Sequence, residues 1–425
     1  MARITEETIK SWSFETKQLH IGQEDYDHAT DARAVPIYQT SSFVFRNSQH
    51  AADRFALRDA GNIYGRLTNP TEDIFEQRMA ALEGGVAALG VASGAAAVTY
   101  AIENVALRGD HIVSAKNIYG GTYNLLEHTL PQYGITATFV DPDEEGAFEN
   151  AINDKTKAVF IETIGNPNAT LIDIEKVAAI AHAHKIPLIL DNTTATAYLF
   201  QGLKHGVDIV VNSSSKYING SSNSISGILT YSGRFQWDPQ MYPQIAAYKK
   251  FGPMAYIARL RNSLFRDTGA CLAPMNAYLN LIGMETLGLR MERQCSNALE
   301  LAQWLEETYP SVTVNYPGLK SSNWYEIAKK QFSRGYGAIL TLRVGSKENA
   351  FALIDALKIP YTLSNIGDTK TLVIHPGSTI SLHSSEQEKE DAGVFEDLIR
   401  VSVGIEDIED LKADFAQAIE KIGAL

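Results

Sequence analysis

The stretch KIPLILD (185–191) decides the fold class, because five consecutive apolar residues lead directly to the carboxylate of Asp191. A short apolar run without polar alternation is typical of a strand that is buried on both faces of a sheet. The preceding segment, IEKVAAIAHAH (174–184), carries its apolar residues at helical spacing. A helix followed by a buried strand predicts a unit of a parallel α/β fold.

Further short apolar runs of the same kind surround this unit. They are VAALGVA (86–92), DHIVSA (110–115), TATFVD (136–141), KAVFIET (157–163), DIVVN (208–212) and GILTYS (227–232). Helical segments separate several of them, including one expected from about Ala95. The alternation predicts a mostly parallel sheet with helices on both faces.

Three regions of the chain differ in pattern. Residues 1–60 hold few periodic segments and are expected to form an extended N-terminal arm with one or two short helices. Residues 61–262 are expected to form the α/β domain. In residues 263–425, one long helix is predicted over 274–307, followed by strand-like runs such as AILTLRV and LIRVSV mixed with helices. This last region is predicted to be a smaller α+β domain joined by the long helix.

The composition of the chain excludes several classes of function. Of the 425 residues, 45% are hydrophobic and 20% charged, and the net charge is −13, which disfavours nonspecific binding to nucleic acid or anionic lipid. The two cysteines, Cys271 and Cys295, form neither a disulfide framework nor a metal-binding spacing. The polar N-terminus lacks a signal-peptide core. We expect a cytoplasmic protein without a metal, a membrane segment or a nucleic-acid partner.

Lys216 closes the run SSSK (213–216) after one of the predicted strands. Ligands of open parallel sheets bind beyond the carboxyl ends of the strands. A lysine desolvated there has a lowered pKa and is a nucleophile toward carbonyls. Ser213 and Ser215, which alternate along a backbone expected to be extended, are predicted to share one face and hold an anion. The alternative is a solvated lysine in a serine-rich loop.

Other strand ends carry polar groups too. The carboxylate of Asp191 either caps the following turn or pairs with a protonated ring nitrogen of a ligand. The turn SGAAA (93–97) leads into a helix whose first amides suit a phosphate, although such glycines often serve only as turns. An acid, a lysine with neighbouring hydroxyls and this helix start together meet the requirements of pyridoxal phosphate.

The sequence resembles the Cys/Met-metabolism family of pyridoxal-phosphate enzymes, and within it the enzymes that act on O-acetylhomoserine. The resemblance spans nearly the whole chain and includes YGRLTNPT (64–71), LEGGVAALGVASG (82–94), DNTTATAYL (191–199), RDTGACLAPMNAYL (266–279) and LIRVSVGIEDIEDL (398–411). It implies a fold-type I pyridoxal-phosphate transferase with a seven-stranded, mostly parallel sheet.

The resemblance also implies roles at the cofactor ring. Lys216 is expected to bond the cofactor's aldehyde and to move the substrate's α-proton. Asp191 is expected to pair with the ring nitrogen, and Tyr119 and Thr193 to lie on the two faces of the ring. Asn166 is expected to reach the ring's phenolic oxygen or the substrate. Tyr119 is also a candidate acid during departure of the leaving group.

Further roles concern the phosphate and the substrate. The resemblance assigns the phosphate to Ser213, Ser215, Gly94 and Ala95. Tyr64 and Arg66 are expected to reach the cofactor of a neighbouring subunit, so the chain is expected to form at least a homodimer, and a homotetramer by analogy. Arg400 and Ser364 are expected to hold the substrate's α-carboxylate, with Tyr64 and Asn166 also near the substrate.

The implied reaction converts O-acetyl-L-homoserine and sulfide, or a small thiol, to L-homocysteine or its thioether and acetate, as in methionine biosynthesis. A methionine γ-lyase or a cystathionine γ-synthase is the alternative, and a non-catalytic protein on the same fold is a third. The chain departs from the family's usual motifs at Asn212, Asn219, Ser221, Ser222, Gly65, Ala95 and Ser381. We expect these departures to affect substrate choice more than cofactor binding.

Overall fold

The computed structural model describes residues 6–24 and 27–423, and its larger sheet has the strand order β1-β7-β6-β5-β4-β2-β3. The strands are β1 (Ala87–Val91), β2 (His111–Ala115), β3 (Thr136–Val140), β4 (Thr156–Glu162), β5 (Leu188–Asp191), β6 (Ile209–Asn212) and β7 (Gly227–Tyr231). Strand β7 is antiparallel to β1 and β6, and the other neighbouring pairs are parallel. The seven predicted strands and the mostly parallel sheet are confirmed.

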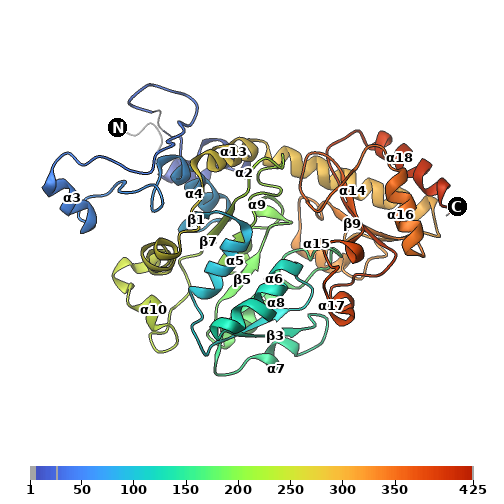
Figure 1. The fold of residues 1–425 in the computed structure, drawn as a ribbon, viewed down its shortest axis with the longest axis horizontal. Coiled ribbons are helices and arrows are strands. Elements are labelled where there is room, and N and C mark those ends of the chain that lie inside the picture. Colours follow the sequence, from blue (N-terminus) through green and yellow to red (C-terminus); the bar gives the residue numbers. More distant parts are fainter. Residues whose placement is uncertain (1–5, 25–26, 424–425) are drawn as a thin grey trace.

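Helices cover this sheet, with α4 and α13 on one side and α6 and α8 on the other (Figure 1). The helices between residues 70 and 268 are α4 (Pro70–Glu83), α5 (Gly94–Glu103), α6 (Gly120–Asn124), η1 (Leu125–Thr129), η2 (Leu130–Tyr133), α7 (Ala147–Ala151), α8 (Ile174–Ala183), α9 (Thr196–Leu199), η3 (Gly202–His205), α10 (Pro243–Ala246), η4 (Lys249–Met254), α11 (Ala255–Leu260), η5 (Arg261–Phe265) and α12 (Arg266–Thr268). The side chains of β5 and β6 are therefore covered from both faces, as their apolar sequences predict.

The parallel strands β4, β5 and β6 are neighbours, so their carboxyl ends lie side by side at one end of the sheet. Residues Leu188, Ile189 and Leu190 of β5 are fully buried, and Asp191 follows them at the edge. Asp191 is the register partner of Glu162 at the end of β4. The parallel register thus collects polar side chains where the buried strands end.

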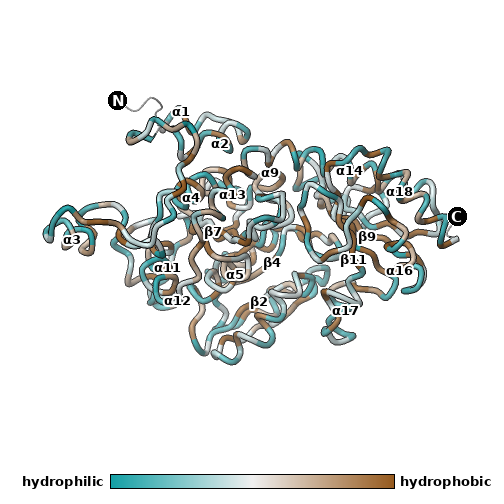
Figure 2. Tube along the Cα trace, turned by 45° about the horizontal axis from the view of Figure 1, so that its top comes forward, coloured by the Kyte–Doolittle hydropathy of each residue, from teal (hydrophilic) through white to brown (hydrophobic). Residues whose placement is uncertain are grey.

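A second sheet forms the smaller C-terminal part, with the strand order β10-β11-β12-β9-β8. Its elements are β8 (Thr313–Asn315), α15 (Tyr325–Gln331), β9 (Ile339–Arg343), α16 (Lys347–Ala356), β10 (Tyr361–Thr362), β11 (Leu372–Ile374), η6 (Pro376–Ser378), α17 (Glu386–Asp391), β12 (Leu398–Ser402) and α18 (Ile408–Lys421). Figure 2 shows hydrophobic stretches along β9 and β11. The short strands β8 and β10 were not predicted from the sequence.

The predicted single helix over 274–307 is wrong, because two helices occupy it: α13 (Pro274–Glu285) and α14 (Leu287–Thr308). They are interrupted at Thr286, whose φ and ψ are −114° and 9°. The side-chain amide of Gln18 bridges the interruption by donating to the carbonyl of Glu285 (3.3 Å) and accepting from the amide of Gly288 (3.2 Å). The backbone groups that the break exposes are thus satisfied by a residue far away in sequence.

The described residues of the N-terminal arm form three short helices rather than one or two: α1 (Glu6–Ser11), α2 (Phe14–His20) and α3 (Ser48–Phe55). Figure 1 shows α3 projecting away from the body of the molecule. Within residues 6–24 and 27–423, no helix is both long enough and apolar enough to cross a membrane. The domain boundaries after residues 60 and 262 stay predictions.

Candidate active site

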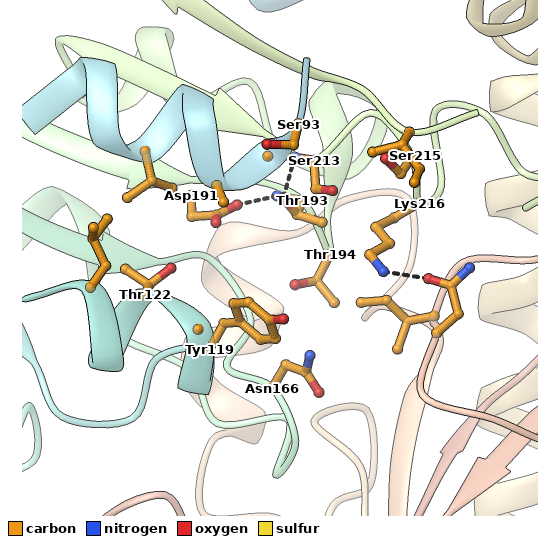
Figure 3. Close-up of a pocket in the computed structure, with 18 of the residues that line it drawn as sticks. Ser93, Tyr119, Thr122, Asn166, Asp191, Thr193, Thr194, Ser213, Ser215 and Lys216 are labelled. Carbon is orange, nitrogen blue, oxygen red and sulfur yellow. Dashed lines mark hydrogen bonds between the residues drawn. The ribbon is translucent and has the colours of Figure 1, made fainter. Parts of the chain in front are cut away.

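A cavity of about 680 Å³ lies beyond the carboxyl ends of β4, β5 and β6. Residues that follow the strands of the larger sheet and the loop between β10 and β11 surround it, and the labelled side chains point into a common space (Figure 3). The predicted site residues that line it are Gly94, Ala95, Tyr119, Asn166, Asp191, Thr193, Ser213, Ser215, Lys216 and Ser364. The structure therefore brings together ten residues that the sequence separates by up to 270 positions.

Lys216 lies in a tight turn rather than on an extended backbone. Strand β6 ends at Asn212, and the amide of Lys216 donates to the carbonyl of Ser213 at 3.1 Å. The prediction that Ser213 and Ser215 alternate along an extended chain is therefore wrong, although both still line the cavity. Burial, followed by the nearby charge of Arg400, lowers the pKa of the Lys216 amine to about 8. The side chain is thus a nucleophile close to neutral pH.

Asp191 lines the cavity, and one of its carboxylate oxygens is hydrogen-bonded within the turn that follows β5. Its Oδ1 accepts a hydrogen bond from the amide of Thr193 (2.9 Å), so part of the predicted capping role is present. The hydroxyl of Thr193 in turn accepts from the amide of Ser213 (2.8 Å). Burial raises the pKa of Asp191, which favours a cationic partner for this carboxylate.

Glu162, at the end of β4, is an acidic residue of the cavity that the sequence interpretation missed. Its Oε1 accepts from the backbone amide of Tyr119 at 2.7 Å. Burial and then the charge of Asp191 raise the pKa of Glu162 well above its ordinary value. Its position at the end of an apolar run, one strand from Asp191, was the sequence signal that could have revealed it.

The ring of Tyr119 borders the cavity opposite Lys216 (Figure 3). The residue is half exposed and lies at the start of α6, where Glu162 anchors its amide. Gly121 makes room for the ring, since a Cβ at this glycine would lie 2.4 Å from the ring's Cε1. The aromatic face is therefore available to a flat ligand in the cavity.

The start of α5 and the turn after β6 form a polar cradle. Ser93 caps α5 by accepting from the amide of Ala96 (3.1 Å), while the amides of Gly94 and Ala95 have no protein acceptor among the described residues. The Ser213 hydroxyl packs against Gly94, where a Cβ would lie 2.5 Å from the Cβ of Ser213. A helix start with free amides and a hydroxyl suits a phosphate. The Ser215 hydroxyl, in contrast, is already bonded to the backbone of Ser226.

Arg400 comes from β12 of the smaller sheet and reaches the edge of the cavity. Its guanidinium donates to Oδ1 of Asn166 (3.0 Å) and to the carbonyl of Asn365 (2.9 Å), while Nε has no protein partner among the described residues. Burial lowers its pKa to about 10. A buried guanidinium with an unsatisfied donor fits a carboxylate ligand. Arg400 does not itself line the cavity, whereas Ser364 and Asn166 do.

Tyr64 and Arg66 lie outside the cavity of their own chain. The Arg66 guanidinium stacks over the ring of Tyr64, with its central carbon 5.5 Å from the ring centroid, and donates to the carbonyl of Arg266. Tyr64 is 42% exposed. Their predicted role toward a neighbouring subunit stays a prediction.

Taken together, the residues fit pyridoxal phosphate. The cavity offers an amine, a carboxylate withdrawn from water, an aromatic face and a cradle of free amides. Each matches one part of that cofactor: its aldehyde, its ring nitrogen, its ring and its phosphate.

Comparisons with known proteins agree with this fit. The sequence pattern of the Cys/Met metabolism PLP-dependent enzymes matches residues 15–420. The chain is 45% identical to the homocysteine/cysteine synthase of Saccharomyces cerevisiae, over 97% of this chain and 98% of the relative. It is 44% identical to the O-acetyl-L-homoserine sulfhydrylase of Leptospira meyeri, over 96% and 97% of the two chains. The solved structure of a putative O-acetylhomoserine (thiol)-lyase from Campylobacter jejuni, which contains N'-pyridoxyl-lysine-5'-monophosphate, superimposes with a TM-score of 0.91 at 39% identity, covering 96% of this chain and all of that one.

Proposed function

Because the chain belongs to the Cys/Met metabolism family of PLP-dependent enzymes, we propose that it replaces the acetoxy group of O-acetyl-L-homoserine with sulfide or a small thiol. The products are L-homocysteine, or its thioether, and acetate. The observation that carries the proposal is that Lys216 and Asp191 line one cavity and that Arg400 is hydrogen-bonded to the lining residues Asn166 and Asn365 at its edge. They supply an amine, an anion for the ring and a cation for an amino-acid carboxylate.

The cofactor, when bound, supplies a protonated ring that withdraws electrons from the carbon next to the substrate's amino group. Asp191 accepts the hydrogen bond of the ring nitrogen and keeps that nitrogen protonated. Lys216 would hold the cofactor through its aldehyde, and its free amine would take the substrate's α-proton at Nζ. Its pKa of about 8 in the buried turn leaves about a tenth of the amine neutral at pH 7, far more than an exposed lysine would have.

Arg400 orients the amino-acid substrate. Its donors face the cavity edge beside Asn166 and Asn365, so the α-carboxylate is held between the two sheets. Tyr119 borders the cavity opposite Lys216 (Figure 3), and its hydroxyl donates a proton to the departing acetate. Sulfide or the thiol takes the place of the acetate at the γ-carbon, Lys216 returns the proton to the α-carbon, and the proton of the incoming nucleophile restores the hydroxyl of Tyr119.

The test is product identification with cofactor-loaded protein. O-Acetyl-L-homoserine and sulfide are expected to yield homocysteine and acetate in equal amounts, and Lys216→Ala is expected to lose almost all turnover while retaining the fold. Release of a ketoacid and ammonia without sulfide would instead assign a γ-lyase, and product formation only with cysteine would assign a cystathionine γ-synthase. Equal activity of Lys216→Ala would exclude all three.

We also propose that the enzyme acts in the cytoplasm as a homotetramer made of two dimers, in each of which the two subunits share their active sites. The proposal is supported by the position of Tyr64 and Arg66 outside their own cavity and by the projecting α3. Sedimentation analysis that finds only monomers in the active enzyme would contradict it.

A further inference from the structure

We propose that Ser222 is a positioning residue that, through Asn365, fixes the place of the Lys216 amine whenever the amine is not bonded to the cofactor. The proposal rests on the role of Lys216 proposed above. Both Ser222 and Asn365 line the cavity beside Lys216. Neither was a candidate site residue in the sequence, where Ser222 was only a departure from the family's motif.

The contacts form one chain of four side chains. The amine of Lys216 donates to Oδ1 of Asn365, and Figure 3 shows this bond as a dashed line. Nδ2 of Asn365 donates to the hydroxyl of Ser222 at 2.8 Å. The hydroxyl of Ser222 donates to Oδ2 of the buried Asp368. The other oxygen of Asp368 accepts from the amide of Lys370 at 2.9 Å.

Asp368 sets the donor-to-acceptor direction of these hydrogen bonds. An ionised carboxylate only accepts, so the hydroxyl of Ser222 must give its single proton to Asp368. Its lone pairs are then free for the NH₂ group of Asn365, which turns the carbonyl oxygen of Asn365 toward Lys216. A reversed amide would place two donor groups against each other. The hydrogen bond from Ser222 to Asp368 therefore orients the amide of Asn365 so that its carbonyl oxygen accepts from the lysine amine.

The backbone positions of Asn365 and Ser222 hold the hydrogen-bonded side chains in place. The carbonyl of Asn365 accepts from Arg400 (2.9 Å), so only the side-chain amide of Asn365 remains to be oriented. Ser222 has a positive φ of 54°, a backbone conformation that is unfavourable for most residues other than glycine and asparagine. Glycine would adopt this conformation without strain, but it would lack the hydroxyl that bonds Asn365 and Asp368.

The charged groups around the amine are Arg400 from β12, Asp191 and Glu162 across the cavity, and Asp368 behind Ser222. The ammonium of Lys370 lies 4.0 Å from Oδ1 of Asp368, on the side away from Ser222's hydrogen bond to Oδ2. Of the groups around the amine, only the link to Asp368 passes through the proposed chain. Variants of Ser222 and Asp368 therefore change the acceptor of Lys216 while leaving the other three groups in place.

Three variants test the proposal. Ser222→Gly removes the hydroxyl and relieves the positive φ. Asp368→Asn keeps the shape but is expected to keep its oxygen on the amide of Lys370 and to donate to Ser222, which reverses the chain. Ser221→Ala is the matched control, because Ser221 does not line the cavity and its hydroxyl has no hydrogen bond among the described residues.

The first measurement is the pH dependence of Lys216 acetylation in the cofactor-free full chain, followed by mass spectrometry. We expect the midpoint to fall by about one pH unit in Asp368→Asn, and less in Ser222→Gly, because the protonated amine loses an acceptor. Ser221→Ala is expected to keep the wild-type midpoint. This measurement needs no substrate, so it stays decisive if the substrate proposed above is wrong.

The second measurement separates positioning from folding. In the cofactor-loaded enzyme, kcat is expected to fall about fivefold in Ser222→Gly while KM and the melting temperature stay near wild type. Wild-type midpoints and kcat in both Ser222→Gly and Asp368→Asn would overturn the proposal. An equal shift in Ser221→Ala would overturn it as well, since it would trace the effect to the loop as a whole.

Discussion

Glu162 and Asp191 are register partners at the ends of β4 and β5, and their two carboxyl groups share one environment withdrawn from water. Burial raises the pKa of both, and the charge of Asp191 raises that of Glu162 well above its ordinary value. Two adjacent buried carboxylates do not ionise together. We infer that Glu162 holds the proton and that Asp191 carries the charge.

Glu162→Gln is therefore expected to retain activity within about threefold, because glutamine reproduces the protonated side chain and still accepts from the amide of Tyr119. Glu162→Ala leaves that amide without its acceptor and is expected to lose about tenfold in kcat/KM. Steady-state kinetics of the two variants with the same substrate check this. Equal losses in both would mean that Glu162 acts as an ionised group.

The same pair predicts a pH-dependent stability difference. An acid with a raised pKa in the folded state destabilises the fold as pH rises above its unfolded value, here 4.5, because the unfolded chain releases the proton first. Glutamine has no such proton. The melting temperature of cofactor-free Glu162→Gln is thus expected to exceed that of the wild type, by a margin that widens between about pH 5 and pH 8. A constant margin over this range would contradict a protonated Glu162.

Gly94→Ala is expected to weaken cofactor binding about tenfold or more, because the new Cβ would lie 2.5 Å from the Cβ of Ser213 and displace the hydroxyl that lines the cradle. Gly120→Ala is the matched control, since a Cβ at Gly120 meets no atom within 4 Å. Titration of cofactor-free protein with pyridoxal phosphate, followed by absorbance, measures both affinities. Unchanged affinity in Gly94→Ala would place the phosphate elsewhere.

Arg400→Lys is expected to raise KM for the amino-acid substrate about tenfold while changing kcat less, because an ammonium cannot keep the contacts to Asn166 and Asn365 and also bind a carboxylate. The charge near Lys216 is kept, so the pKa of that amine is not expected to shift greatly. Arg343→Lys on the neighbouring strand β9 is the control. An unchanged KM in Arg400→Lys would remove Arg400 from substrate binding.

The strands of the larger sheet were predictable because each is a continuous apolar run, which is a local property of the sequence. The positions of Asp191, which ends such a run, and of Lys216, which lies in the turn after another, were predictable for the same reason. The pairing of Asn365 with Lys216 and the bridge that Gln18 makes across the break at Thr286 were not predictable. Both depend on contacts between segments more than 100 residues apart, which no local pattern encodes.

The extended backbone expected at Ser213 and Ser215 failed for a related reason. An apolar run shows where a strand is buried but not where its last hydrogen bond falls, and β6 stops at Asn212. The turn that follows places Ser213 beside Gly94 and turns Ser215 toward Ser226. Of the two serines, therefore, only Ser213 has its hydroxyl beside the start of α5, where we predict the phosphate to bind.

The last prediction concerns the neighbouring subunit. If Arg66 serves the site of a partner chain, Lys216→Ala and Arg66→Ala are each expected to be nearly inactive alone, yet a mixed dimer contains one site with both native residues. Co-expression of the two variants under separate affinity tags, followed by tandem purification, is expected to restore about half of the wild-type activity per dimer. If Arg66 served its own chain instead, each site of the mixed dimer would lack one of the two residues. Purified mixed dimers without activity would therefore contradict the shared site, and wild-type subunits carried through the same two tags control for purification losses.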